Sequence, residues 1–232
     1  MRICGISDMH GNLDFSIEPC DVLCICGDIF PLEIQNYSKP CEKWFAEEFL
    51  LWCDKQPVKE ILLIGGNHDF WLSRHSDNAK LECLKSPKNV RITYLQDESY
   101  EYIDEDSGKV YTFYGTPWCH KFGDWAFMPE TDDTLSYHFE KIPDKLDVLL
   151  THDAPYGVSD VCLQDVWWNK KEHIGSKPLA NAVVIKQPKI LLHGHLHTTN
   201  REEELLGKTS VYNVSLLDEK YEMVYKPLYL EI

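Results

Sequence analysis

The chain has 232 residues, 44% of them hydrophobic, and a formal net charge of −15. That length accommodates one domain with a full hydrophobic core, and the hydrophobic fraction is ordinary for a folded globular protein. The acidic balance repels a phosphate backbone, which argues against stable nucleic-acid binding. No apolar run approaches the roughly 20 residues of a membrane span, and the first residues lack a signal-peptide run, so we expect a cytoplasmic protein without membrane contact.

The nine cysteines are an odd number and show no spacing typical of a disulfide framework. Cys4, Cys24 and Cys26 lie inside apolar runs, which is typical of reduced, buried thiols in a reducing compartment. A metal site at Cys24 and Cys26 is the weaker interpretation, because alternation along one strand explains their spacing. The cysteine pattern therefore agrees with a cytoplasmic location.

The first part of the chain alternates apolar runs with helical segments. Strands are predicted at 2–7, 21–27 and 60–65, and the last two read as strands covered on both faces. Aromatic residues at i, i+3 and i+4 spacings predict a helix over 40–57, and a shorter helix is predicted over 77–84.

The middle of the chain has a different pattern, with three short strands that predict an antiparallel meander. An irregular, aromatic-rich segment follows, and then buried strands return. The predicted strands are 90–95, 99–103, 110–114, 146–150, 189–192, 209–214 and 222–230; a helix is predicted over 179–186, a long loop over 156–177 and a solvated turn over 202–204. Since no linker or repeat is visible, residues 1–232 are expected to form one α/β domain of two mixed sheets with helices outside.

Five of the predicted buried strands end in a small polar cluster. Ligands of α/β folds bind at the carboxyl ends of strands, where loops converge on one edge, and residues i and i+2 of an extended segment point the same way. The clusters are Asp8-x-His10, Gly27-Asp28, Gly66-Asn67-His68-Asp69, His152 and Gly194-His195-x-His197. Each cluster alone is explained by turn chemistry or by a buried histidine. All five together favour a common site.

Carboxylate, imidazole and amide oxygen make a mixed nitrogen and oxygen donor set. Such a set suits Mn, Fe or Zn better than it suits a calcium site or a thiolate site. Two carboxylates do not neutralise two divalent cations, so the site would keep a positive charge that attracts phosphate.

At this point the chain resembles the calcineurin-like metallophosphoesterase superfamily, whose five blocks are all present without substitution. The resemblance implies a four-layer α-β-β-α sandwich with a two-metal centre at one edge. It implies that one cation is held by Asp8, His10, Asp28 and His197, and that the other is held by Asp28, Asn67, His152 and His195, with Asp28 bridging. By the same resemblance, Asn67 and His68 contact the substrate and His68 is the catalytic residue, whereas His193 is left to the core or to an outer supporting role.

A narrower likeness rests on 115–118, 124–127 and 173–176, which resemble the metallophosphoesterase-domain-containing branch. That branch is associated with hydrolysis of cyclic nucleotides and other phosphodiesters. Trp118 or Trp168 is a candidate for stacking on a base or an aryl leaving group. Packing in the core or in a loop is the alternative explanation for both.

We therefore predict a hydrolase that cleaves a phosphodiester bond in a small nucleotide-like substrate through a hydroxide bridging two divalent ions, with Mn²⁺ preferred and Fe, Zn or Ni as alternatives. His68 is expected to stabilise charge on the phosphoryl group and to protonate the leaving oxygen, with Asp69 or Asp28 orienting it. A phosphomonoesterase, a nuclease and a non-catalytic scaffold are the alternatives. The intact ligand set argues against the scaffold.

Overall fold

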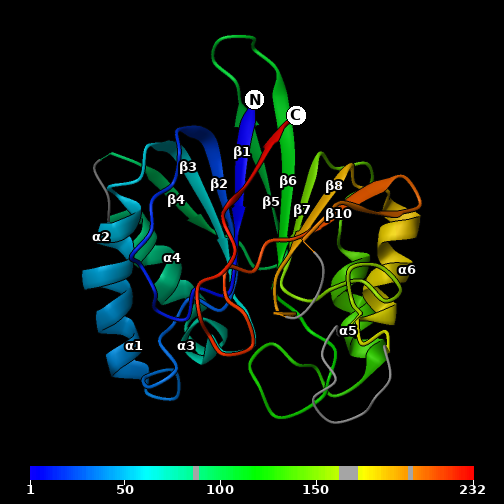
Figure 1. Cartoon of the computed structure of the whole chain (residues 1–232), viewed down its shortest axis with the longest axis horizontal. Helices are drawn as coiled ribbons and strands as arrows, with labels where there is room; N and C mark the ends of the chain where they lie inside the picture. The colour runs from blue at the N-terminus through cyan, green and yellow to red at the C-terminus, as the bar shows by residue number, and fades with distance from the viewer. Residues whose placement is uncertain (86–88, 162–171, 198–200) are drawn as a thin grey trace.

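A computed structural model describes residues 1–85, 89–161, 172–197 and 201–232. Two β-sheets pack face to face, and helices cover the outer face of each (Figure 1). The predicted four-layer α/β sandwich of two mixed sheets is confirmed. Within the described residues, none of the helices combines the length and the apolar character that crossing a membrane requires.

The first sheet has the strand order β11-β1-β2-β3-β4. The three pairings among β1 to β4 are parallel, and β11 joins β1 antiparallel. The strands are β1 (Arg2–Ile6), β2 (Cys20–Cys26), β3 (Val58–Ile64), β4 (Arg91–Tyr94) and β11 (Leu228–Glu231).

Helices α1 (Ser38–Trp44), α2 (Leu50–Cys53), α3 (Phe70–Arg74) and α4 (Ser76–Lys85) cover the outer face of this sheet, and a π-helical segment, η1 (Phe45–Phe49), joins α1 to α2. The aromatic spacing that predicted one helix is confirmed as a continuous helical run. Its rings form the core against the sheet, as in the Phe45–Phe49 pair, whose ring centroids are 5.4 Å apart. Helix α3 was not predicted.

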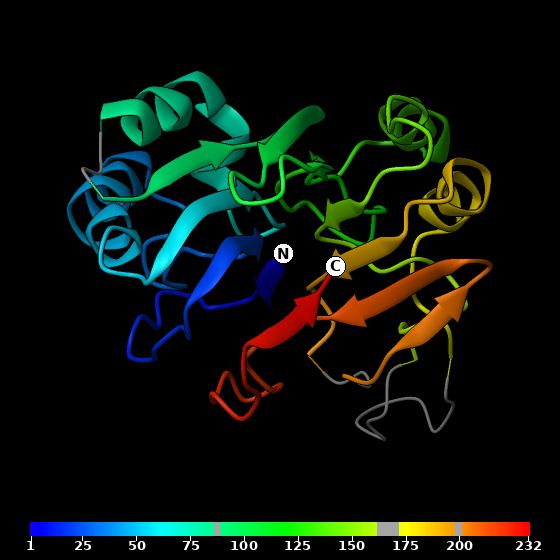
Figure 2. The same cartoon turned by 90° about the horizontal axis from the view of Figure 1, so that it is seen from above.

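The second sheet has the order β5-β6-β7-β8-β10-β9, with parallel pairing from β6 through β8 to β10 and antiparallel pairing at both edges. The strands are β5 (Glu98–Ile103), β6 (Val110–Thr116), β7 (Val148–Thr151), β8 (Ile190–His193), β9 (Glu204–Leu206) and β10 (Thr209–Asn213). Helices α5 (Asp132–Glu140) and α6 (Lys177–Lys186) cover its outer face, as the view from above also shows (Figure 2). Between the sheets lies a second apolar core, to which β2 and β3 contribute from one side and β7 and β8 from the other.

Four details of the secondary structure predicted from the sequence are corrected. The meander is wrong, because β4 pairs in parallel with β3 while β5 and β6 pair in the other sheet. Helix α5 lies in the segment read as irregular. Glu204 begins β9 instead of ending a turn, and the last strand covers Leu228–Glu231 alone within the stretch 222–232. Trp168 lies outside the described residues.

Candidate metal centre

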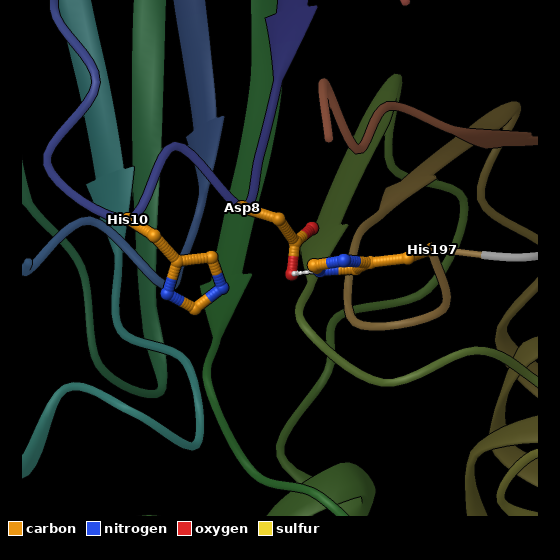
Figure 3. Close-up of side chains that lie close together, drawn as sticks. All are labelled: Asp8, His10 and His197. Atoms are coloured by element: carbon orange, nitrogen blue, oxygen red, sulfur yellow. Dashed lines mark ion pairs between the residues drawn. The ribbon is translucent and has the colours of Figure 1, made fainter. Parts of the chain in front are cut away.

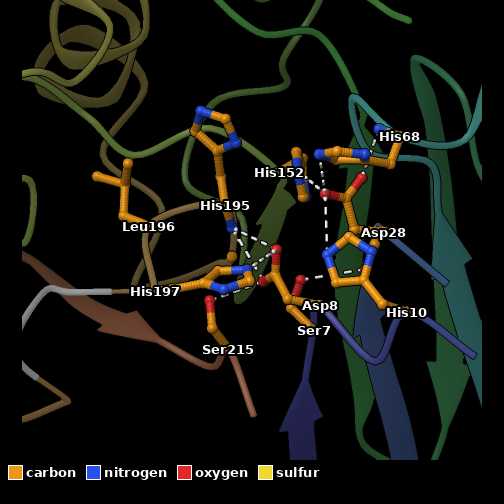
Figure 4. A network of polar contacts seen from close by, with 12 residues as sticks. Ser7, Asp8, His10, Asp28, His68, His152, His195, Leu196, His197 and Ser215 are labelled. Atoms are coloured by element: carbon orange, nitrogen blue, oxygen red, sulfur yellow. Dashed lines mark hydrogen bonds and ion pairs between the residues drawn. The ribbon is translucent and has the colours of Figure 1, made fainter. Parts of the chain in front are cut away.

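The loops after β1, β2 and β3 meet the loops after β7 and β8 at one edge of the sandwich. This edge brings together polar side chains that are far apart in the sequence (Figure 4). Two groups of side chains each have donor atoms that all lie within 4.8 Å of one another. One group is Asp8, His10 and His197, and the other is Asp8, Asp28 and His152. The first group is drawn in Figure 3. The parallel strands therefore bring the predicted donors together at the edge where their carboxyl-end loops meet.

Asp28 lies at the centre of the cluster. Its Oδ2 is 3.4 Å from Nε2 of His152, 3.7 Å from Nε2 of His10 and 4.0 Å from Nε2 of His68. Its Oδ1 accepts the backbone N–H of His68 at 2.8 Å. One carboxylate oxygen is thus fixed by the backbone while the other faces three imidazoles.

Asp8 is fully buried and is held by the other half of the chain. Its carboxylate accepts the backbone N–H of His195 at 3.0 Å and the hydroxyl of Ser215 at 2.7 Å. Its Oδ1 remains 3.3 Å from Nε2 of His197. The segment after β10 therefore completes a site that begins after β1.

Two imidazoles are oriented by backbone carbonyls. Nδ1 of His152 lies 2.7 Å from the carbonyl oxygen of Cys26, and Nδ1 of His197 lies 2.9 Å from that of Asp218. Because a carbonyl only accepts, each Nδ1 carries the proton and each Nε2 is directed at a carboxylate. Metal-binding histidines are characteristically held in this way.

The charge balance of the site also favours a cation. Burial lowers the pKa of His152, but the Asp28 and Asp8 carboxylates outweigh burial and raise it to about 10. A proton on Nε2 and a divalent cation are alternative ways to satisfy this nitrogen and the facing carboxylates.

His10 provides the clearest test of whether the donors fit a metal. Both ring nitrogens are buried and have no hydrogen-bond partner among the described residues, although the ring lies beside Asp28 and within the Asp8 group. Burial lowers the pKa of His10 to about 4, which keeps the ring neutral and its lone pair available. A buried imidazole without a partner costs free energy unless something binds it, so the donor set fits a metal ion.

Asn67 and His195 are the last two predicted ligands, and they lie at different distances from the two close donor groups. The side-chain oxygen of Asn67 lies 2.9 Å from Nε2 of His152, within the cluster. The His195 ring extends away from the Asp8 carboxylate (Figure 4) and lies 5.2 Å, between centroids, from the His152 ring. It belongs to neither of the two close donor groups and lines the cavity above them.

Four of the predicted ligands have left-handed backbone conformations: φ is 55° at Asp8, 44° at His10, 53° at Asp28 and 69° at His195. Such conformations are uncommon for residues with a side chain, cost about 1–3 kcal/mol each and cluster at functional sites. Gly66 allows the loops to approach, since a Cβ there would lie only 2.5 Å from the backbone nitrogen of Asp28. These turns direct the four side chains toward the centre of the donor cluster, and the backbone is strained as a result.

His68 faces the cluster from the loop after β3, with its side chain 14% exposed. Its Nδ1 lies 2.6 Å from the amide oxygen of Gln35, which therefore orients the ring. Asp69 and Asp28 were the two carboxylates expected to orient His68, and among the described contacts Asp69 does not touch its ring. The Asp69 carboxylate instead accepts the backbone N–H groups of Asp28 at 2.7 Å and Gly66 at 2.8 Å, and so ties two ligand loops together.

The two remaining polar neighbours support structure around the site. Asp153 accepts both the backbone N–H and the Nδ1–H of His120, each at 2.8 Å. Nε2 of His193 lies 3.0 Å from the hydroxyl of Ser159, inside the protein. His193 is thus a buried structural histidine.

A cavity of about 420 Å³ lies over the donors. Its described lining is Asp28, Asn67, His68, Phe122, Trp125, Ile174, His195, Leu196, His197, Glu219 and Tyr221. Trp118 is not among these residues, and its stacking on a base or an aryl leaving group stays a prediction. Its indole N–H donates to Asp97 at 3.0 Å, and its ring stacks on His138 at 3.8 Å between centroids.

The sequence model of the calcineurin-like phosphoesterase family matches residues 1–199. The chain belongs to this family. Its members are metal-dependent phosphoester hydrolases with a dinuclear centre, so the chain is an enzyme of that kind, and the buried Asp and His cluster is where its metals are expected.

Two curated relatives and one solved structure are similar to this chain. Metallophosphoesterase domain-containing protein 1 of Homo sapiens is 27% identical over 248 residues, covering 100% of this chain and 71% of that protein. A UPF0046 protein of Caenorhabditis elegans is 30% identical over 193 residues, covering 76% of this chain and 63% of that protein. The fold is similar to the phosphopantetheinyl hydrolase of Mycobacterium tuberculosis, with TM-score 0.58 and 13% identity over 94% of this chain and 90% of that one.

Three residues of this phosphoesterase site were missed from the sequence. Gln35 orients His68, Tyr221 lies with its ring 5.0 Å from the His10 ring, and Trp125 lies 4.6 Å from the His68 ring, both between centroids. Gln35 and Tyr221 stand outside the five blocks and carry no motif. Trp125 was part of a recognised segment, but nothing in the sequence distinguished it from Trp118.

Proposed function

We propose that this phosphoesterase hydrolyses phosphodiester bonds in small, nucleotide-like substrates. Asp8, His10, Asp28 and His197 would hold one divalent cation, and Asp28, Asn67, His152 and His195 the other, with Mn²⁺ preferred and Fe, Zn or Ni as alternatives. The position of Asp28 Oδ2 among three imidazoles supports a bridging role. The bound pair would supply positive charge and bring the pKa of a water toward neutrality.

His68 is proposed as the catalytic residue of the chain. Its ring lies on the cavity wall beside Asp28, near enough to contact a phosphoryl group held by the donors. Because Nδ1 is hydrogen-bonded to Gln35, the nitrogen that faces the cluster is Nε2. We assign these steps to the imidazolium form of the ring, which carries a second proton on Nε2: that N–H would stabilise charge on the phosphoryl oxygens and give its proton to the leaving oxygen, steps that typically contribute about 10²–10⁴-fold.

The observation that favours a diester is the charge of the cavity wall. Among the described lining residues there is no lysine or arginine, and Glu219 adds a carboxylate at the wall. A monoester carries about −1.5 to −2 charges near neutral pH, whereas a diester carries one, so the monoester is the less favourable occupant of such a wall. The formal net charge of −15 likewise disfavours a long nucleic-acid strand.

A substrate panel tests this function. The Mn²⁺-loaded protein is assayed with bis-p-nitrophenyl phosphate, p-nitrophenyl phosphate and single-stranded DNA, with Asp28→Asn as the inactive control. We expect the diester to be hydrolysed with the highest kcat/KM. A higher kcat/KM for the monoester would replace the proposal by a phosphomonoesterase, and efficient cleavage of DNA would replace it by a nuclease. No turnover with Mn, Fe, Zn or Ni would leave a non-catalytic scaffold.

A further inference from the structure

A second cavity adjoins the metal cavity. Its volume is about 470 Å³, and Trp125 lines both cavities. Aromatic side chains form much of its wall, with Phe70, Trp118 and Phe127 alongside Trp125. The two cavities therefore meet at one indole, which lies 4.6 Å between ring centroids from the proposed catalytic His68.

The main chain fixes Trp125 beside the metal loops. The backbone N–H of Ala126 donates to the carbonyl of Asn67 at 3.0 Å, and that of Cys119 donates to the carbonyl of Phe127 at 2.9 Å. Trp125 is nevertheless 37% exposed. Its ring lies against those of His68 and Phe70, so an indole that is packed on part of its surface and open on the rest is suited to stack on a ligand, because little order is lost on binding.

Trp118 differs from Trp125 in this respect. His138 stacks on its ring, and Asp97 accepts its N–H, so the protein already uses its face and its polar edge. Trp118 therefore forms part of the wall of the second cavity, whereas Trp125 leaves part of its ring exposed where the two cavities meet.

The charges around the second cavity offset one another. Lys121 pairs with Glu130 at 2.6 Å and with Asp124 at 3.4 Å, and Arg74, which lies over the Phe70 ring, supplies one further cation. Two cationic and two acidic side chains thus line a space whose other described walls are mostly aromatic and apolar, with Ser73, Thr134 and His138 as neutral polar or imidazole groups. Such a lining suits an uncharged aromatic ring better than a second phosphate.

We propose that the second cavity binds an aromatic group of the phosphoester, an aryl ring or a nucleobase, and that Trp125 selects for it by stacking. The inference rests on the proposed function to the extent that the phosphorus lies over the metal donors. It names the substrate class as aromatic phosphoesters in preference to aliphatic ones. Stacking of a base on an aromatic side chain is worth about 1–3 kcal/mol, or about five- to 150-fold in affinity.

The experiment compares two phosphonates that the enzyme does not hydrolyse. Dissociation constants of phenylphosphonate and methylphosphonate are measured calorimetrically with the Mn²⁺-loaded wild type, Trp125→Ala and Trp125→Phe. We expect the phenyl compound to bind the wild type about tenfold more tightly, an advantage that Trp125→Ala removes and Trp125→Phe keeps. Tyr137→Ala, which removes an exposed ring outside both cavities, should keep the advantage as well.

Equal affinity of the two phosphonates for the wild type would overturn the inference, as would an unchanged preference in Trp125→Ala. An equal loss for both compounds would assign Trp125 to the support of His68 instead of to ring recognition, and would also overturn it. The measurement does not depend on turnover. A preference for phenylphosphonate that needs Trp125 would stand even if the diester panel identified another esterase activity.

Discussion

The amide oxygen of Gln35 lies 2.6 Å from Nδ1 of His68. An amide oxygen can only accept, so the proton of the neutral ring is on Nδ1 and Nε2 is left to face Asp28 and the cavity. Gln35 comes from the loop after β2, and it therefore couples the orientation of the proposed catalytic ring to the loop that also carries Asp28.

Replacing Gln35 by leucine should lower kcat about tenfold with metal content unchanged, since loss of an outer partner of a functional imidazole typically costs about 10–100-fold. Gln35→Glu keeps an acceptor and should retain most turnover. An equal loss of kcat in Gln35→Leu and Gln35→Glu would show that Gln35 does not act as a hydrogen-bond acceptor for His68.

His68→Ala should retain its metals but lose about 10²–10⁴-fold in kcat, because a proton donor and a charge-stabilising group are removed together. Elemental analysis and steady-state kinetics on the same preparation measure both quantities. His75→Ala, a histidine at the end of α3, is the matched control and should be fully active. Retained turnover in His68→Ala would refute the assigned role.

Asp28→Asn should disturb both metals at once, because one oxygen of this carboxylate faces donors of both proposed sites. We expect less than one ion per chain by elemental analysis, against two in the wild type. Asp147→Asn, which changes a carboxylate paired with Lys189 at 2.6 Å at the opposite end of β7 from His152, should bind two. A variant at Asp28 that keeps one tightly bound ion would argue against bridging.

Chelation should destabilise the wild type measurably. A ligand present at 100 times its dissociation constant stabilises the native state by about 2.7 kcal/mol, and 1 kcal/mol shifts Tm by about 2–4 °C for a chain of this size. Removing the metal with EDTA should therefore lower Tm by about 5–10 °C, and Mn²⁺ should restore it. The Tm of Asp28→Asn should hardly respond to either treatment; a comparable shift there would place the stabilising ion elsewhere.

Asp97 should be the most costly carboxylate to remove outside the metal centre. It accepts hydrogen bonds from Thr116 at 2.7 Å, His138 at 2.6 Å and Lys141 at 3.0 Å, besides that from Trp118. Asp97→Ala leaves these donors without their acceptor and should lower the free energy of unfolding by about 3–5 kcal/mol in urea titrations. Asp144→Ala, at an exposed carboxylate, should change it by less than about 0.5 kcal/mol.

The pH dependence of this stabilisation has a definite sign. Burial raises the pKa of Asp97, but the hydrogen bonds from His138, Thr116 and Lys141 outweigh burial and lower it below the usual 3.8. The contribution is therefore fully present above about pH 3.8 and is lost as pH falls through the lowered pKa. The stability difference between wild type and Asp97→Ala should stay constant from pH 8 to pH 5 and shrink in stronger acid.

The fold class and the donor cluster could be predicted because both depend on local signals. Buried strands are visible as apolar runs, and parallel strands bring their carboxyl-end loops to one edge, so Asp8 and His152 could be expected to meet. Helix α5 also had a local signal that was overlooked: Thr131 caps it by accepting the N–H of Thr134, and Asp132 and Asp133 follow in the first turn.

The pairing of β4 could not be predicted in the same way. Its residues Arg91–Tyr94 fit a strand in either sheet, and the choice of β3 as its partner depends on packing between distant elements. Gln35, Trp125 and Tyr221 were missed for a related reason. They lie in irregular loops, where the direction of a side chain depends on tertiary contacts that the spacing of residues in the sequence does not reveal.

The hydrogen bond from Ser215 to Asp8 spans 207 residues of sequence. During synthesis, the loops carrying Asp8, His10, Asp28 and Asn67 emerge long before the residues that support them, His195 and Ser215. Chains fold from the N-terminus as they are made, but this centre depends on contacts of very long range, which form late. Tight metal uptake should accordingly mark the completion of folding, so that a nascent or truncated chain does not sequester the ions of the mature enzyme.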